Sequence, residues 1–126
     1  MQHKFETKVY YCDTDAEGVV YYANYLKWFE IGRTQLLESQ GIDLTKLRNE
    51  QGYVFPVKKM SVEYSLPAKL YEEVIVETEL ESFSGVRFPF KQKVIRKKDQ
   101  ALCVAAEIEL VAVDKETLKP KKLRIL

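Results

Sequence analysis

The sequence predicts an α+β domain in which a five-stranded antiparallel sheet is wrapped around one long central helix. One run of alternating apolar and polar residues precedes a single helical segment, and four such runs follow it. The helical segment carries apolar residues on more than one side, so we expect the sheet to cover it broadly. Consecutive strands joined by short turns form one antiparallel sheet, whose apolar face can fold around the helix.

The first strand and the helix are predicted from local patterns. Alternation indicates a strand over residues 5–11, which ends at the Asp-Thr-Asp turn of residues 13–15. The helix is predicted from about residue 23 to residue 40, because Gly41 is a typical residue just beyond a helix C-terminus. Gly32 lies in mid-helix, where glycine costs about 1 kcal/mol relative to alanine. We therefore expect a strand to approach the helix closely at Gly32.

Four strand-like runs follow a charged connection that covers residues 42–52. They cover residues 53–64, 74–80, 86–94 and 102–112, separated by turn residues at 66–68, 82–85 and 97–100. In the last run, Leu102 and every second residue after it are expected to face the core. Acidic side chains alternate on the second run and basic ones on the third, and opposed charges of this kind contribute about 0.2–1 kcal/mol per pair. We expect these charges to lie on the solvent face.

Length and charge exclude several classes of protein. With 126 residues the chain is predicted to be a single domain over residues 1–126. A formal net charge of +1 favours neither nucleic acid nor an anionic membrane as a partner. No apolar run approaches the roughly 20 residues of a transmembrane helix, and the charged N-terminus does not resemble a signal peptide. Cys12 and Cys103 are too few for a disulfide framework, so we expect a cytoplasmic protein.

A candidate site lies between the first strand and the helix. Asp13 and Asp15 precede Gly18 and an apolar run that leads into the helix N-terminus. A helix N-terminus offers free N–H groups and partial positive charge, which can hold a developing oxyanion. A carboxylate beside them can act as a base or a nucleophile, which suits acyl chemistry. Spacing alone favours acids that only cap turns or the helix, and we expect Asp13 to shape the loop in this way.

The sequence contains no recognisable metal-binding motif. His3 is the single histidine and lies at the end of the first strand, where a surface role is expected. No cluster of histidine and cysteine has the spacing of a metal site. We therefore expect neither a metal nor another cofactor.

Three segments resemble a known family. The string DTDAEGVVYYANYLKWFEIGR, residues 13–33, resembles the signature of the 4-hydroxybenzoyl-CoA thioesterase family. It is most similar to the branch of bacterial acyl-CoA thioesterases associated with the Tol–Pal system, as are FPVKKMSVEYSLPAKLYEEV and VAVDKETLKPKKL. The resemblance implies the hot-dog fold, a curved antiparallel sheet around a central helix. It also implies hydrolysis of a small or medium acyl-CoA without metal, by a homodimer or homotetramer with sites at subunit interfaces.

The resemblance assigns roles to individual residues. It makes Asp15 the catalytic aspartate, as base or nucleophile, and the backbone N–H of Tyr22 the oxyanion donor. Many members of the Tol–Pal branch carry histidine where this chain has Tyr22, so a histidine-assisted mechanism lacks its residue here. Gly18 is a substrate-binding candidate because glycine allows close backbone approach or a positive φ. Val19 is another candidate, although an apolar residue in this run is more typical of packing.

Two further substrate contacts are implied across the subunit boundary or at the CoA phosphates. Phe55 is expected beside the acyl group of the neighbouring subunit, and a place in the core is the alternative. Arg87 is the first candidate for the phosphates of CoA, with Lys58 and Lys59 behind it. For each basic residue the alternative is a solvated face or a cross-strand ion pair.

Two other functions compete with hydrolysis. A hot-dog hydratase or dehydratase pairs a histidine with an acid, and His3 is misplaced for that chemistry. A non-catalytic protein of the same fold, which binds acyl-CoA or a protein partner, would not require Asp15.

On the helix, Glu30 and Arg33 are spaced to form an intrahelical ion pair worth about 0.2–0.5 kcal/mol.

Overall fold

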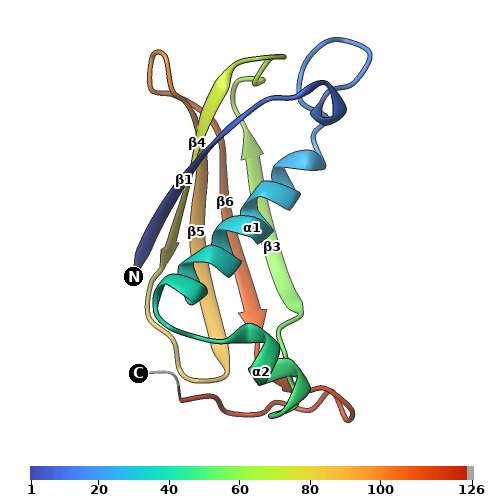
Figure 1. Ribbon diagram of the computed structural model, residues 1–126, viewed down its shortest axis with the longest axis vertical. Helices are drawn as coiled ribbons and strands as arrows, with labels where there is room; N and C mark the ends of the chain where they lie inside the picture. Colours follow the sequence, from blue (N-terminus) through green and yellow to red (C-terminus); the bar gives the residue numbers. More distant parts are fainter. Residues whose placement is uncertain (125–126) are drawn as a thin grey trace.

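The computed structural model describes residues 1–124 and has a five-stranded sheet packed against one long helix (Figure 1). Helix α1 (Asn24–Ser39) lies across one face of the sheet. The five-stranded sheet has the order β1-β4-β5-β6-β3, with every neighbouring pair antiparallel. Its strands are β1 (Gln2–Lys8), β3 (Val57–Tyr64), β4 (Glu73–Leu80), β5 (Arg87–Arg96) and β6 (Ala101–Val111). The predicted α+β class, strand number and central helix are therefore confirmed.

Short elements interrupt two of the predicted strands. The first strand ends at Lys8, earlier than expected, because residues Tyr11–Asp13 form a 3-10 turn, η1. The run over residues 53–64 is divided at Pro56, which has no N–H to donate to a ladder. Its first part, β2 (Tyr53–Val54), pairs with β7 (Val113–Asp114) beside the short helix α2 (Leu44–Asn49).

The core lies between α1 and the sheet. Phe29 and Leu36 of α1 are fully buried, as are Val76 of β4 and Val94 of β5. A Cβ atom added to Gly32 would contact the Thr78 hydroxyl of β4. The expected close approach of helix and strand at Gly32 is therefore confirmed, and it explains why glycine is used there despite its helix propensity.

The expected ion pair between Glu30 and Arg33 is wrong. The Arg33 guanidinium is buried and donates from Nη1 to Gln92 Oε1 on β5 at 2.9 Å. Gln92 Nε2 in turn donates to the Phe29 carbonyl of α1 and to Thr78 Oγ1, each at 2.8 Å. Burial lowers the pKa of Arg33, and the charge of Glu30 partly opposes that shift. Arg33 thus belongs to a polar network between helix and sheet.

A β-bulge in β6 overturns the prediction for Leu102. Val94 pairs with Val104 and Ile95 pairs with Leu102, so Cys103 has no partner on β5. The extra residue reverses the alternation. Leu102 consequently faces solvent and Cys103 is fully buried. Cys12, which follows the predicted first strand, is exposed in η1.

The outer face of the sheet carries the expected opposed rows of acidic and basic side chains. Glu77 and Glu79 of β4 lie opposite Lys93 and Lys91 of β5. Lys4 of β1 also reaches Glu77, at 3.1 Å. Among residues 1–124, no helix has the length and apolar character that a membrane span requires.

Candidate active site

The Asp-Thr-Asp stretch forms a miniature hairpin in front of α1. Asp13 O accepts from Tyr21 N at 2.9 Å, and Asp15 N donates to Val19 O at 3.0 Å. The turn closes through a 3.2 Å bond from Gly18 N to Asp15 O. Gly18 has φ +77°, and no atom would lie within 4 Å of a Cβ added to it. Glycine is therefore required for its positive φ.

The two acids of this hairpin have different environments. Asp13 is buried, and its carboxylate accepts from Tyr10 N and Asn24 Nδ2, each at 2.9 Å. Its expected role in shaping the loop is confirmed. Asp15 is exposed, and its Oδ1 accepts from Glu17 N at 2.8 Å. Within residues 1–124 its second oxygen accepts no hydrogen bond, so this oxygen is oriented and accessible.

The start of α1 has free N–H groups, as a site for a developing negative charge requires. The residue before the helix is Ala23, whose side chain cannot accept a hydrogen bond from the first turn. Tyr22 precedes it, and within residues 1–124 its N–H donates to no other backbone group. In the first turn, Asn24 N and Leu26 N donate to Tyr21 O and Ala23 O at 2.8 and 3.1 Å. The Tyr22 N–H, together with the helix dipole, is therefore the group that can hold an oxyanion. In the sequence, Ala23 indicates this uncapped helix start, because the residue before a helix usually has a polar side chain that caps the first turn.

Tyrosines join the helix start to the end of β3, a feature that the sequence did not reveal. The Tyr64 hydroxyl donates to Tyr22 O at 3.3 Å, and the two rings meet edge to face with centroids 6.5 Å apart. Tyr25 packs on Tyr64 at 5.8 Å, and its hydroxyl accepts from Ala68 N at 3.0 Å. Burial raises the pKa of both Tyr25 and Tyr64, so both phenols stay neutral.

The remaining predicted contacts lie elsewhere in this chain. Val19 is half-buried and forms a bridge with Lys69 near the Asp15 turn. Phe55 lies just before β3, at the end opposite Tyr64, where its ring stands edge to face on Phe88 at 5.8 Å. Arg87 is exposed at the start of β5, near that same lower end of Figure 1. One chain therefore brings together Asp15, Gly18, Val19 and Tyr22, but neither Phe55 nor Arg87.

The described residues offer no ready metal centre. Among residues 1–124, no group of three or more His, Cys, Asp and Glu side chains is placed to hold a metal ion. His3 Nε2 lies 2.9 Å from Gln35 Oε1 of α1, away from the Asp15 hairpin.

Comparison with known proteins identifies the class. The sequence model of the thioesterase-like superfamily matches residues 9–124. Acyl-CoA thioester hydrolase YbgC of Escherichia coli is 37% identical over 120 residues, covering 95% of this chain and 88% of the relative. Acyl-CoA thioesterase YbgC of Haemophilus influenzae is 37% identical over 116 residues, covering 92% and 84%.

Solved structures agree with this match. The DHNA-CoA thioesterase of Staphylococcus aureus superposes with a TM-score of 0.88 at 29% identity, covering 96% of this chain and 80% of that one. The 1,4-dihydroxy-2-naphthoyl-CoA thioesterase Slr0204 of Synechocystis superposes with a TM-score of 0.91 at 22% identity, covering 98% and 90%, which shows the shared fold. The chain belongs to the thioesterase-like superfamily and is a thioesterase with the hot-dog fold.

Proposed function

We propose that this chain hydrolyses the thioester of a small or medium acyl-CoA to the free acid and CoA. The observation that carries the proposal is the pairing of an exposed, oriented carboxylate at Asp15 with an uncapped helix start at Tyr22. The relatives named for acyl-CoA hydrolysis, at 37% identity over nearly the whole chain, support the same reaction.

The chemistry follows from these two groups. The thioester oxygen would accept a hydrogen bond from the Tyr22 N–H, which strengthens as the carbonyl becomes a tetrahedral oxyanion. Asp15 would either take a proton from an attacking water or attack the carbonyl itself. Collapse of the intermediate breaks the C–S bond and releases CoA thiolate. In the nucleophilic route, water then hydrolyses the mixed anhydride formed with Asp15. Thiolate leaves readily, so no general acid is needed.

A complete site is proposed to need two chains. β3 is an edge strand, and Val57, Met60 and Tyr64 on it are each nearly half exposed, at 46–49%. Two β3 edges pairing antiparallel about a twofold axis would bury this apolar surface. That arrangement brings the Phe55 end of one chain toward the Tyr64 end of its partner. We therefore propose a homodimer, or a homotetramer built from it, in which Phe55 lines the partner's acyl site.

Arg87 is proposed as the first residue to hold the CoA phosphates. Its side chain is exposed, and within residues 1–124 it forms no ion pair. The same is true of Lys58 and Lys59, which remain secondary candidates. An arginine is preferred because its fork of donors matches two phosphate oxygens at once.

Compartment and cofactor are also proposals. Cys12 and Cys103 are both free thiols, which suits a reducing cytoplasm. The proposed steps need only Asp15, water and backbone donors, so we propose that catalysis requires no cofactor besides the CoA of the substrate.

The test is release of free thiol from acyl-CoA esters of graded chain length and from aromatic acyl-CoAs. The proposal predicts turnover of at least one small or medium acyl-CoA, unchanged by a metal chelator. A non-catalytic binding protein would instead show a thermal shift with acyl-CoA and no thiol release. That second result, across the whole panel, would overturn the proposed hydrolysis.

A further inference from the structure

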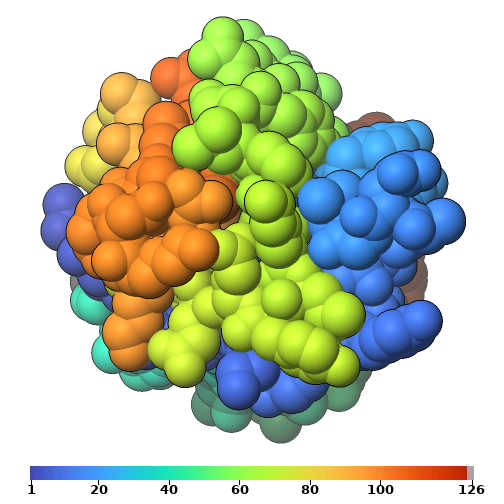
Figure 2. Space-filling model, turned by 90° about the horizontal axis from the view of Figure 1, so that it is seen from above, coloured from blue at the N-terminus to red at the C-terminus, as the bar shows by residue number. Residues whose placement is uncertain are grey.

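The segment Ala68–Glu72, which connects β3 to β4, supports the Asp15 hairpin. Val20 N donates to Ala68 O at 2.9 Å, and Leu70 N donates to Gly18 O at 3.1 Å. Figure 2, viewed from above, shows this yellow-green connection between the blue residues 9–24 and the orange β5–β6 hairpin. The position of the Asp15 hairpin therefore depends on the conformation of the Ala68–Glu72 connection.

The same segment also holds the two elements on either side of the Asp15 hairpin. Ala68 N donates to the Tyr25 hydroxyl in the first turn of α1 at 3.0 Å. At the other side, Tyr71 N donates to Val9 O at 2.9 Å, and Val9 N donates to Glu72 O at 2.8 Å. The Ala68–Glu72 segment thus fixes the relative positions of the Asp15 hairpin, the start of α1 and the residues that follow β1.

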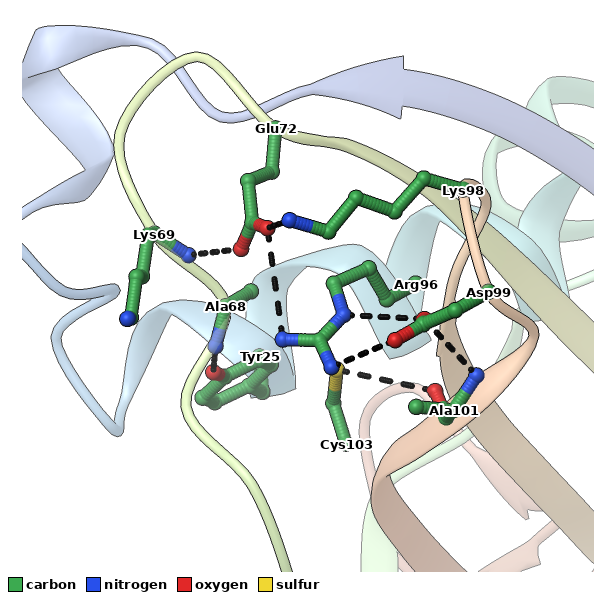
Figure 3. Close-up of polar contacts among 9 residues, drawn as sticks. All are labelled: Tyr25, Ala68, Lys69, Glu72, Arg96, Lys98, Asp99, Ala101 and Cys103. Atoms are coloured by element: carbon green, nitrogen blue, oxygen red, sulfur yellow. Dashed lines mark hydrogen bonds and ion pairs between the residues drawn. The ribbon is translucent and has the colours of Figure 1, made fainter.

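The connection adopts a conformation that needs support. Tyr71 has φ +68°, a left-handed conformation that is unfavourable for a bulky residue. Glu72 closes the turn, because its Oε1 accepts from Lys69 N at 2.8 Å. Its other oxygen, Oε2, lies 3.0 Å from Lys98 Nζ and 4.0 Å from Arg96 Nη1. Figure 3 shows these contacts converging on one carboxylate from two directions.

The partners of Glu72 are themselves fixed. Arg96 donates from Nε and Nη2 to the two oxygens of Asp99, at 2.9 and 2.8 Å, within the β5–β6 hairpin. The Glu72 side chain is only 12% exposed. Burial alone would raise its pKa, but bonds from Lys98 and the Lys69 N–H, with the charges of Lys98 and Arg96, lower it below its usual value. Glu72 is therefore a charged and well-ordered carboxylate at neutral pH.

We propose that Glu72 is a positioning residue for the reaction, which ties the Ala68–Glu72 connection to the β5–β6 hairpin and so holds Asp15 against the Tyr22 N–H. The inference rests on the proposed roles of Asp15 and Tyr22. Glu72 itself touches no reacting atom. Its effect is exerted through the hydrogen bonds of Ala68 and Leu70 to the Asp15 hairpin.

The matched pair for the test is Glu72→Ala and Glu73→Ala. Glu73 is the adjacent acid and also pairs with the β5–β6 hairpin, at 3.4 Å from Lys97 Nζ, but on the exposed outer side. We expect Glu72→Ala to lower kcat by about tenfold with KM within about twofold, because displaced reacting groups cost up to about 100-fold. Glu73→Ala should leave kcat and KM within about twofold, the ordinary effect of a surface ion pair. Glu72→Gln, which keeps an acceptor for Lys69 N–H, should lie between them.

A second measurement separates positioning from general destabilisation and from failure of the proposed reaction. In Glu72→Ala, hydrogen exchange at the Val20 and Leu70 amides should accelerate by at least about tenfold, while core amides such as Val94 remain protected. If the wild type releases no thiol, the proposed function fails, and exchange alone decides the role of Glu72. Unchanged exchange at Val20 and Leu70 would overturn the proposal. So would uniform loss of protection, or equal kcat losses in Glu72→Ala and Glu73→Ala. If Glu72→Ala does not fold, Glu72→Gln is judged by the same readouts.

Discussion

The Asp13 carboxylate accepts a 2.9 Å hydrogen bond from the side chain of Asn24, the first residue of α1. The same carboxylate accepts from Tyr10 N, so the buried acid fastens the hairpin to both flanking segments. The carboxylate of Asp15, two residues further on, accepts only at Oδ1 within residues 1–124, and it stays exposed. One acid of the pair therefore serves structure, which leaves the other accessible for chemistry.

Asp13→Asn should destabilise the protein more than it impairs turnover. The amide replaces one acceptor oxygen by a donor that faces the N–H of Tyr10 or Asn24. An unsatisfied buried group of this kind costs about 1–3 kcal/mol of unfolding free energy. Urea denaturation measures this loss, and kcat should fall far less than in Asp15→Asn. An unchanged denaturation midpoint would show that the two hydrogen bonds contribute nothing.

Removing Arg33 should be tolerated better than removing its partner. Arg33→Met removes a buried cation whose Nε has no hydrogen-bond partner among residues 1–124, and it leaves only Gln92 Oε1 without a partner, at a cost of at most about 1–3 kcal/mol. Gln92→Ala instead leaves Arg33 Nη1, the Thr78 hydroxyl and a helix carbonyl without their partner. We expect it to cost at least about 1–3 kcal/mol. Thermal unfolding of both variants compares them, and the opposite order of stability would contradict this account of the network.

Acid should weaken the β5–β6 hairpin through Asp99. Hydrogen bonds from Arg96 lower the pKa of Asp99 from 3.8 to about 2. A depressed pKa stabilises the fold above the ordinary pKa, and that contribution disappears as pH falls through the depressed value. The Tm difference between wild type and Asp99→Asn should therefore be constant at neutral pH, shrink below about pH 4 and vanish near pH 2. A difference that persists unchanged at pH 2 would rule out this ion pair as its source.

Tyr22→Phe should retain most activity. The proposed oxyanion donor is the backbone N–H of Tyr22. The hydroxyl that donates to the Tyr22 carbonyl comes from Tyr64, not from Tyr22 itself. We expect kcat to fall less than about tenfold, which is under about 1.4 kcal/mol in barrier. Steady-state kinetics on the best acyl-CoA checks this. Inactivity equal to that of Asp15→Asn would assign the phenol itself to the chemistry and refute the backbone donor.

Local patterns carried the fold prediction well, and long-range pairing limited it. Alternation and turn residues predicted α1 and the succession of five strands along the chain, because both depend on near neighbours. The expectation that consecutive strands pair throughout is wrong, since β3 pairs with β6 and β4 pairs with β1. The bulge at Cys103 depends on how β5 and β6 pair, so alternation alone misplaced Leu102. Likewise Arg33 found Gln92, far away in sequence, instead of the nearby Glu30.

Only the part of the candidate site formed by the Asp-Thr-Asp turn and the helix start was predictable from the sequence. The Asp-Thr-Asp turn and the following helix lie in one continuous stretch, so their meeting is a local event. Spacing could not tell Asp13 from Asp15, because burial and the partner Asn24 distinguish them. Tyr64 and Glu72 contribute through side-chain contacts with residues distant in sequence, Tyr64 with Tyr22 and Glu72 with the β5–β6 hairpin. The proposed contributions of Phe55 and Arg87 depend on a second chain, which no pattern within one sequence specifies.

The most direct test of the central claim is kcat of Asp15→Asn on the best acyl-CoA, with Glu17→Gln as the matched control. Glu17 is an exposed acid in the same turn, and only its backbone bonds Asp15. We expect Asp15→Asn to lose at least about 100-fold in kcat, the lower end of what a positioned base contributes. Glu17→Gln should retain wild-type kcat, and circular dichroism of both variants should be unchanged. Wild-type turnover by a folded Asp15→Asn protein would contradict the account.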